Sequence, residues 1–124
     1  MNISEVASVL DASVIWGHEK LDREVHSACG ADLMSDVMAF VKDDVVLLTG
    51  LNNIQVIRTA DIMDIHVIVF VRGKKPNGEM IALAAQKDII LLSTDNSLFI
   101  SSGKLYKAGL TGAGVRPIDD FGRQ

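Results

Sequence analysis

Three uninterrupted apolar runs divide the middle of the chain, with polar turns and helical patterns between them. The runs cover residues 45–49, 66–71 and 89–93. None of them alternates between apolar and polar positions, so both faces of each predicted strand should be buried. Residues 53–64 and 77–87 instead repeat apolar positions at helical spacing. The order strand, helix, strand, helix, strand predicts parallel βαβ units and an α/β fold.

Shorter patterned segments lie on either side of this region. We predict two strands and three helices there, over residues 13–17 and 24–29 and over residues 3–11, 33–41 and 96–108. Asp32 is suited to cap the helix at 33–41, and Ser93–Asp95 to cap the last helix, which should stop at Gly109. Glycine-rich and polar residues follow, so we predict one domain over residues 1–110 and a flexible tail over 111–124.

Composition and charge limit the classes of function. The chain has 124 residues and a formal net charge of −4, with its basic residues scattered. Proteins that bind nucleic acid or anionic membranes usually carry a clustered positive field, so neither partner is expected. No apolar run is long enough to span a bilayer, and the first residues do not resemble a signal peptide. The single cysteine, Cys29, fits a reducing compartment, so we expect a cytoplasmic location.

Candidate binding residues follow each of the three core strands. In a parallel α/β sheet, ligands bind beyond the carboxyl ends of the strands, where three loops should meet. Each loop leads into a helix N-terminus, whose free backbone N–H groups favour an anion. We therefore predict a site for a phosphate-bearing small molecule, made of Thr49, Gly50, Asn52, Arg72, Gly73, Lys74, Lys75, Thr94 and Asp95. The alternative is that these glycines make turns, the polar side chains cap helices and the lysines face solvent.

Motifs of nucleotide-dependent enzymes are missing. The chain lacks the glycine-rich phosphate loop that ends in Lys-Ser or Lys-Thr. Residues 109–114 look like a dinucleotide loop, but they follow a predicted helix instead of a strand. His18, His26 and His66 have no common spacing that would suit a metal ion. No cofactor is therefore expected.

Two further groups of residues could carry chemistry. Asp32 and Asp36 share one face of a predicted helix and could hold a divalent cation, although helix capping explains them more simply. Cys29 precedes a glycine at a predicted junction between a strand and a helix, where a thiol can become reactive. Cys29 has no second cysteine and no evident base to act with it, so we predict no catalytic residues and no metal site.

Several stretches resemble the DRTGG-domain family. The most specific is Asp-Leu-Met-Ser-Asp-Val-Met-Ala at residues 32–39. The other stretches are residues 21–25, the Arg-Gly-Lys-Lys-Pro loop at 72–76, residues 92–95 and residues 103–106. The literal string that names the family is absent, because Glu24 follows Asp22 and Arg23.

This resemblance implies a three-layer α/β/α domain with a mostly parallel sheet of about four to five strands. Such domains are similar to the N-terminal domain of HPr kinase/phosphorylase, without the kinase domain. They also occur fused to phosphotransacetylases and between CBS domains in regulatory pyrophosphatases, where they help to form dimers. Stand-alone copies are often encoded beside iron-only hydrogenase genes. The resemblance supplies no catalytic residues.

We therefore predict a non-catalytic regulatory or assembly domain that forms a homodimer and senses a nucleotide or another phosphate-bearing metabolite. The apolar content of 48 % is high enough to supply a subunit interface as well as a core. The alternative is a protein-interaction accessory subunit of a redox complex of the iron-only hydrogenase type, with no ligand. A small enzyme that uses Cys29, or Asp32 and Asp36, is a third hypothesis.

Overall fold

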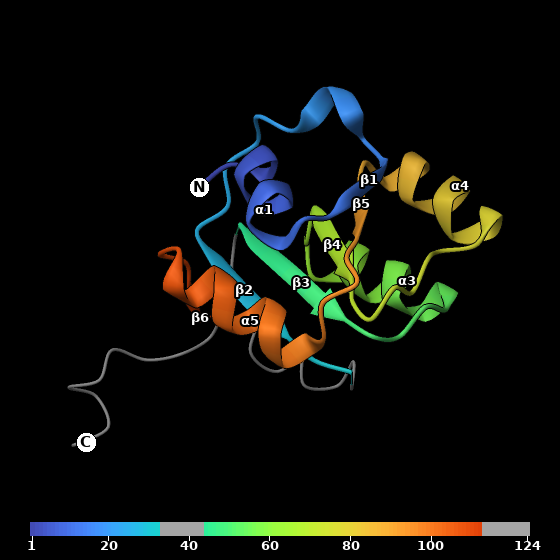
Figure 1. Ribbon diagram of the computed structural model, residues 1–124. Helices are drawn as coiled ribbons and strands as arrows, with labels where there is room; N and C mark the ends of the chain where they lie inside the picture. Colours follow the sequence, from blue (N-terminus) through green and yellow to red (C-terminus); the bar gives the residue numbers. More distant parts are fainter. Residues whose placement is uncertain (33–43, 113–124) are drawn as a thin grey trace, which may run out of the picture.

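Six strands form one sheet in the computed structural model, which describes residues 1–32 and 44–112 (Figure 1). The strand order is β1-β5-β4-β3-β2-β6. Every neighbouring pair is parallel except β1 with β5, which is antiparallel. The strands are β1 Ser13–Trp16, β2 Ser27–Gly30, β3 Val45–Thr49, β4 Val67–Phe70, β5 Ile90–Ser93 and β6 Thr111–Gly112. The predicted α/β class with a mostly parallel sheet is confirmed, although the sheet is larger than expected.

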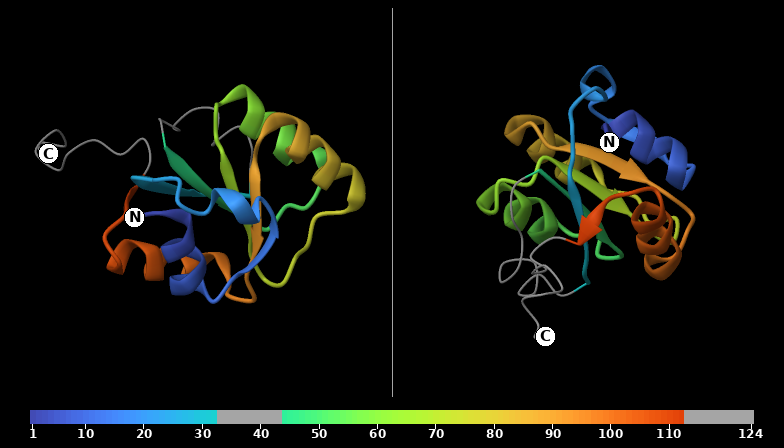
Figure 2. Two further views of the ribbon diagram at one scale, coloured as in Figure 1. Left: turned by 90° about the horizontal axis from the view of Figure 1, so that it is seen from above. Right: turned by 90° about the vertical axis from the view of Figure 1, so that its left-hand side faces the viewer.

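Helices cover both faces of this sheet. Figure 2 shows α1 and α5 together on one face, and α3 and α4 together on the other. The helices are α1 Ile3–Leu10, α3 Ile54–Ile62, α4 Gly78–Lys87 and α5 Leu98–Lys107, with a short 3-10 turn, η1, at His18–Lys20. The expected three-layer α/β/α arrangement is therefore present. The helix predicted over 33–41, with Asp36, lies outside the described residues.

The core consists of two apolar clusters, one on each side of the sheet. Val46 and Leu48 of β3 belong to the cluster under α1 and α5, whereas Leu47 belongs to the cluster under α3 and α4. All residues of β3, β4 and β5 are buried. Because helices cover both faces, successive side chains of one strand enter different clusters, and this explains the uninterrupted apolar runs.

The start of α5 differs from the prediction. Its N-cap is Ser97, whose hydroxyl oxygen accepts a hydrogen bond from the backbone N–H of Ile100 at 3.2 Å. The prediction that Ser93–Asp95 provides this cap is wrong. The Thr94 hydroxyl instead donates to the carbonyl oxygen of Leu10 at 2.7 Å. This bond joins the end of β5 to the end of α1, so Thr94 fixes a tertiary contact.

The last described strand, β6, was not predicted. Thr111 and Gly112 pair in parallel with Ser27 and Ala28 of β2. The sheet therefore takes in the first two residues of the segment predicted as a tail. Residues 113–124 lie outside the described part of the chain, so the tail stays a prediction.

An ion pair connects η1 to the turn after α4. The Lys20 ammonium donates to the Asp88 carboxylate, and this hydrogen bond lowers the pKa of Asp88 below its ordinary value. A lowered pKa stabilises the fold above the ordinary pKa of aspartate, and the contribution is lost as the pH falls through the folded-state pKa. Asp88 is also in the left-handed backbone conformation, which asparagine adopts readily.

Asp88→Asn should therefore destabilise the protein by less than about 1 kcal/mol at neutral pH, because both partners are largely exposed. We expect the difference in unfolding free energy between Asp88→Asn and the unmodified protein to vanish in strong acid. There the Asp88 carboxylate of the unmodified protein is protonated in both the folded and the unfolded state. Urea unfolding of both proteins in neutral and in strongly acidic buffer measures this. A destabilisation of equal size in both buffers would show that the charge is not its cause.

Candidate functional site

The three predicted loops meet at the carboxyl ends of β3, β4 and β5. The backbone N–H of Arg72 donates to the carbonyl oxygen of Asn96, and that of Gly73 donates to Thr94, each at 2.8 Å. These bonds join the loop after β4 to the loop after β5. The side-chain amide of Asn52 donates to the carbonyl oxygen of Lys75 at 3.3 Å, and so joins the loop after β3 to the same region. Parallel strands of one sheet place these loops together, as the sequence predicts.

Arg72 is central to this site. Its guanidinium lies against the backbone of Gly50, so close that a Cβ atom at position 50 would collide with it. The Arg72 side chain is 54 % exposed, and its Nη2 atom is 4.0 Å from Oδ2 of Asp32. The guanidinium is therefore positioned over the end of β3 and remains accessible to a ligand.

Asp32 contributes a carboxylate that the predicted site did not include. Its Oδ1 accepts a hydrogen bond from the backbone N–H of Gly50 at 2.7 Å and from the Thr49 hydroxyl at 3.4 Å. Asp32 was predicted as a helix cap or, with Asp36, as a cation ligand. Both predictions involve residues outside the described part of the chain. Within that part, Asp32 holds the loop after β3 and lies beside Arg72.

In the loop after β4, the backbone amides of Arg72, Gly73 and Lys74 are already occupied. Besides the bonds of Arg72 and Gly73, the backbone N–H of Lys74 donates to the carbonyl oxygen of Val71 at 3.1 Å. In the loop after β3, the backbone N–H of Leu51 donates to the Thr49 hydroxyl at 3.1 Å. At the helix N-termini, where an anion was expected, the caps Asn53, Asn77 and Ser97 each accept one backbone N–H group. The cationic donors of the site are the guanidinium of Arg72 and the ammonium groups of the exposed Lys74 and Lys75.

The remaining predicted site residues have supporting positions. Thr49 and Thr94 are buried, and their hydroxyls bond to the protein. Gly73 is in the left-handed conformation with a φ of 71°, and a Cβ atom there would lie 3.2 Å from Oδ1 of Asp95. Asp95 is exposed and adds a second carboxylate beside the three cationic side chains.

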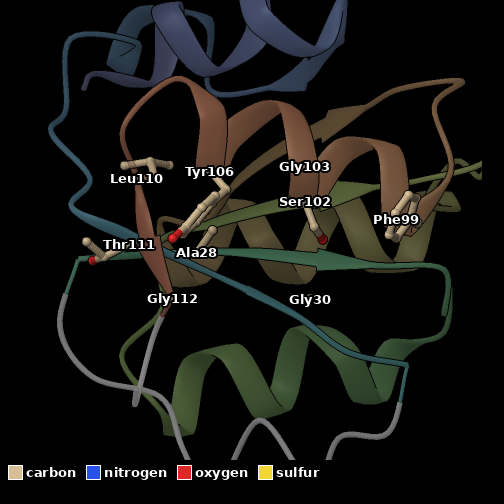
Figure 3. A pocket seen from close by; sticks show the side chains of 9 residues that line it. All are labelled: Ala28, Gly30, Phe99, Ser102, Gly103, Tyr106, Leu110, Thr111 and Gly112. Atoms are coloured by element: carbon tan, nitrogen blue, oxygen red, sulfur yellow. The ribbon is translucent and has the colours of Figure 1, made fainter. Parts of the chain in front are cut away.

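A separate cavity lies between α5 and the edge of the sheet. Figure 3 shows Phe99, Ser102 and Tyr106 extending from α5 toward β2. The cavity has a volume of about 340 Å³, and Gly30 of β2 contributes to its lining. It was not predicted, because a sequence does not show which strand a helix covers. The available signal was the pair of aromatic residues seven positions apart on one helix, with Gly103 between them.

The other candidate residues form no metal site where the structure describes them. No group of three or more histidine, cysteine, aspartate or glutamate residues is placed to hold a metal ion in residues 1–32 and 44–112. His26 contacts Asp44 at 3.3 Å, and His66 contacts Asp64 at 3.2 Å, so each histidine has one acidic neighbour. Cys29 is half-buried in β2. Within the same ranges, no helix is long and apolar enough to cross a membrane.

Comparisons with known proteins agree with this architecture. The family model described as the DRTGG domain matches residues 5–107. No curated protein sequence matches the chain. Among solved structures, the chain is similar to the CBS and DRTGG domains of the regulatory region of Clostridium perfringens pyrophosphatase, crystallised with its activator diadenosine tetraphosphate. The sequence identity is 13 % and the TM-score 0.72, so this likeness shows a shared fold.

The alignment covers 98 % of this chain and 58 % of the pyrophosphatase chain, so this protein spans little more than half of that regulatory region. The family match is broader evidence than the short motifs in the sequence, because it extends from α1 to α5. It includes the loops after β3, β4 and β5 that form the candidate site. The chain therefore belongs to the DRTGG domain family.

Proposed function

We propose that this protein is a regulatory domain that binds a nucleotide through its phosphate groups, with Arg72 as the main contact, and catalyses no reaction. Membership of the DRTGG family and the likeness to a regulatory region support the regulatory part of this proposal. The bound activator of that neighbour is a nucleotide, which supports the ligand class. Homodimer formation and a redox-complex partner stay predictions.

The observation that carries the proposal is the backbone conformation of Arg72. Five non-glycine residues have a positive φ in the part of the chain that the structure describes, and four of them are aspartates. Aspartate tolerates this left-handed conformation because its short side chain bonds locally. Arginine has no short side chain that tolerates this conformation, yet the φ of Arg72 is 58°. Residues held in a strained conformation cluster at binding sites, where the strain positions a side chain.

Guanidinium groups bind phosphate through two parallel hydrogen bonds, which a lysine ammonium does not match. The 4.0 Å separation from Asp32 is longer than a direct hydrogen bond, so the N–H groups of Arg72 remain available for a ligand. Lys74 and Lys75 add positive charge nearby. Asp32 and Asp95 oppose it, so binding should require a ligand with several negative charges, such as a nucleoside triphosphate.

The test is thermal unfolding with and without ATP. A ligand at ten times its dissociation constant stabilises the fold by about 1.4 kcal/mol. For a domain of this size the midpoint should rise by several degrees. Arg72→Gly should abolish this rise. In the absence of ATP the variant should stay within about 1 kcal/mol of the unmodified protein, because glycine relieves the left-handed strain while it makes the unfolded chain more flexible.

Arg58→Ala is the matched control, because it removes the same charge from the exposed surface of α3. It should retain the full response to ATP. The proposal fails if the unmodified protein does not respond to millimolar ATP, or if Arg72→Gly responds as strongly as Arg58→Ala.

A further inference from the structure

The cavity beneath α5 has the character of a site for a neutral, flat ring. None of the residues that line it is charged, and most of its surface is apolar. Its volume of about 340 Å³ lies at the lower end of the range for small-molecule sites. Hydroxyl groups of Ser102 and Tyr106 are the polar groups that α5 brings to it (Figure 3). A phosphate would find no positive partner here, whereas a heteroaromatic ring could bond these hydroxyls through its edge.

Two aromatic side chains flank this cavity. Phe99 is 83 % exposed and Tyr106 is 76 % exposed, which is unusual for large apolar rings. They are seven residues apart on α5, so their backbones are separated by about 10 Å along the helix axis. Gly103 lies between them, and a Cβ atom there would contact nothing within 4 Å. This spacing leaves room for a flat ring to stack against either aromatic side chain.

Gly30, at the end of β2, connects the cavity along the chain to the candidate phosphate site. Gly30 lines the cavity, and two residues later Asp32 bonds Gly50 and lies beside Arg72. Two residues of extended chain span at most about 7 Å. Gly30 and the Asp32 carboxylate beside Arg72 are thus close enough for one nucleotide to reach both.

We infer that this cavity binds the base of the nucleotide whose phosphates contact Arg72. The inference rests on the proposed function and extends it, because it assigns the base and the phosphates to different elements. Stacking on Phe99 or Tyr106 contributes most of the base affinity. The hydroxyls of Ser102 and Tyr106 bond the edge of the ring.

Gly103→Leu tests this inference, since the new side chain would occupy the space between the two aromatic residues. The variant should fold, because leucine favours a helix more than glycine does and its Cβ atom meets no neighbour. Gly78→Leu is the matched control. It makes the same change in α4, on the other face of the sheet, where a Cβ atom also meets nothing within 4 Å. Calorimetric titration with ATP, adenosine and inorganic tripolyphosphate measures the affinities.

The expected result is that Gly103→Leu weakens ATP and adenosine binding by about tenfold, as loss of base stacking would. Tripolyphosphate binding should be unchanged, and Gly78→Leu should bind all three compounds normally. The inference is overturned if Gly103→Leu binds ATP normally while Arg72→Gly does not, and in that case the proposed function survives. Adenosine binding that survives Arg72→Gly but not Gly103→Leu would support the cavity and overturn the phosphate site.

Absence of any binding to the unmodified protein would overturn both the base site and the phosphate site.

A further contrary outcome concerns a different occupant of the cavity. If Gly103→Leu changes the molar mass in light scattering and leaves ATP binding intact, the cavity face is a contact between copies of the chain, and the base site is rejected.

Discussion

Replacing Phe70 by alanine is expected to lower the free energy of unfolding by about 3 to 5 kcal/mol. Phe70 is 0 % exposed and belongs to the apolar cluster under α3 and α4. It lies in β4, whose backbone pairs with both β3 and β5. Neighbouring strands hold the backbone in place, so the space left by the ring cannot close. A loss of this size is comparable with the whole stability of many small domains, which is about 5 to 15 kcal/mol.

Ile62→Ala is the control for this measurement. Ile62 is in α3 on the same side of the sheet, but it is 67 % exposed, so its removal should change the stability by less than about 0.5 kcal/mol. Urea unfolding followed by circular dichroism gives both values. Equal losses for the two variants would contradict the burial that the structure assigns to β4.

Gly17→Ala is the second change with a large expected effect. Gly17 has a φ of 98°, a backbone conformation that alanine adopts only with strain. A Cβ atom there would also lie 2.8 Å from Cγ1 of Ile90, a buried residue of β5. Cγ2 and Cβ of Ile90 would also be close, at 3.2 and 3.3 Å, so the isoleucine side chain cannot turn away within the packed core. We expect the two effects together to cost about 2 to 4 kcal/mol.

Gly109→Ala separates these two causes. Gly109 has a similar φ of 115°, but a Cβ atom there would meet nothing within 4 Å. It should therefore cost only the conformational part, about 1 to 2 kcal/mol. Urea unfolding of both variants compares them. If Gly17→Ala were no more destabilising than Gly109→Ala, the close approach of Gly17 to Ile90 would be wrong.

The centre of the fold was predictable because short stretches of the sequence determine its strands and helices. β3, β4 and β5 are apolar at every position except Thr49 and Ser93, which end β3 and β5, and only a strand covered on both faces requires this. The caps Asn53 and Asn77 stand directly before α3 and α4, where a side chain bonds the first free N–H groups. Features that depend on distant partners were not predictable. β6 has two residues, too few to show a period, and Thr94 reaches a carbonyl 84 residues away.

The candidate site, too, was predictable only where it does not depend on contacts between distant parts of the chain. Parallel βαβ units place their loops at one end of the sheet, so the sequence predicted which segments would meet. It did not predict that carbonyl oxygens would accept the backbone N–H groups of Arg72 and Gly73, because these bonds arise from how two loops pack. Nor did it predict Asp32 beside Gly50, since that contact joins β2 to β3. The site therefore presents side-chain cations beside the helix N-termini that the sequence predicted.

The strand order has a consequence for how the protein assembles during synthesis. β3, β4 and β5 follow one another in the chain and pair in that order, each joined to the next through a single helix. The two edges differ, because β1 pairs with β5 and β6 pairs with β2. We expect the central strands to form first and both edges last. On the ribosome, β1 is made before β5, so it must wait for its partner until β5 has emerged.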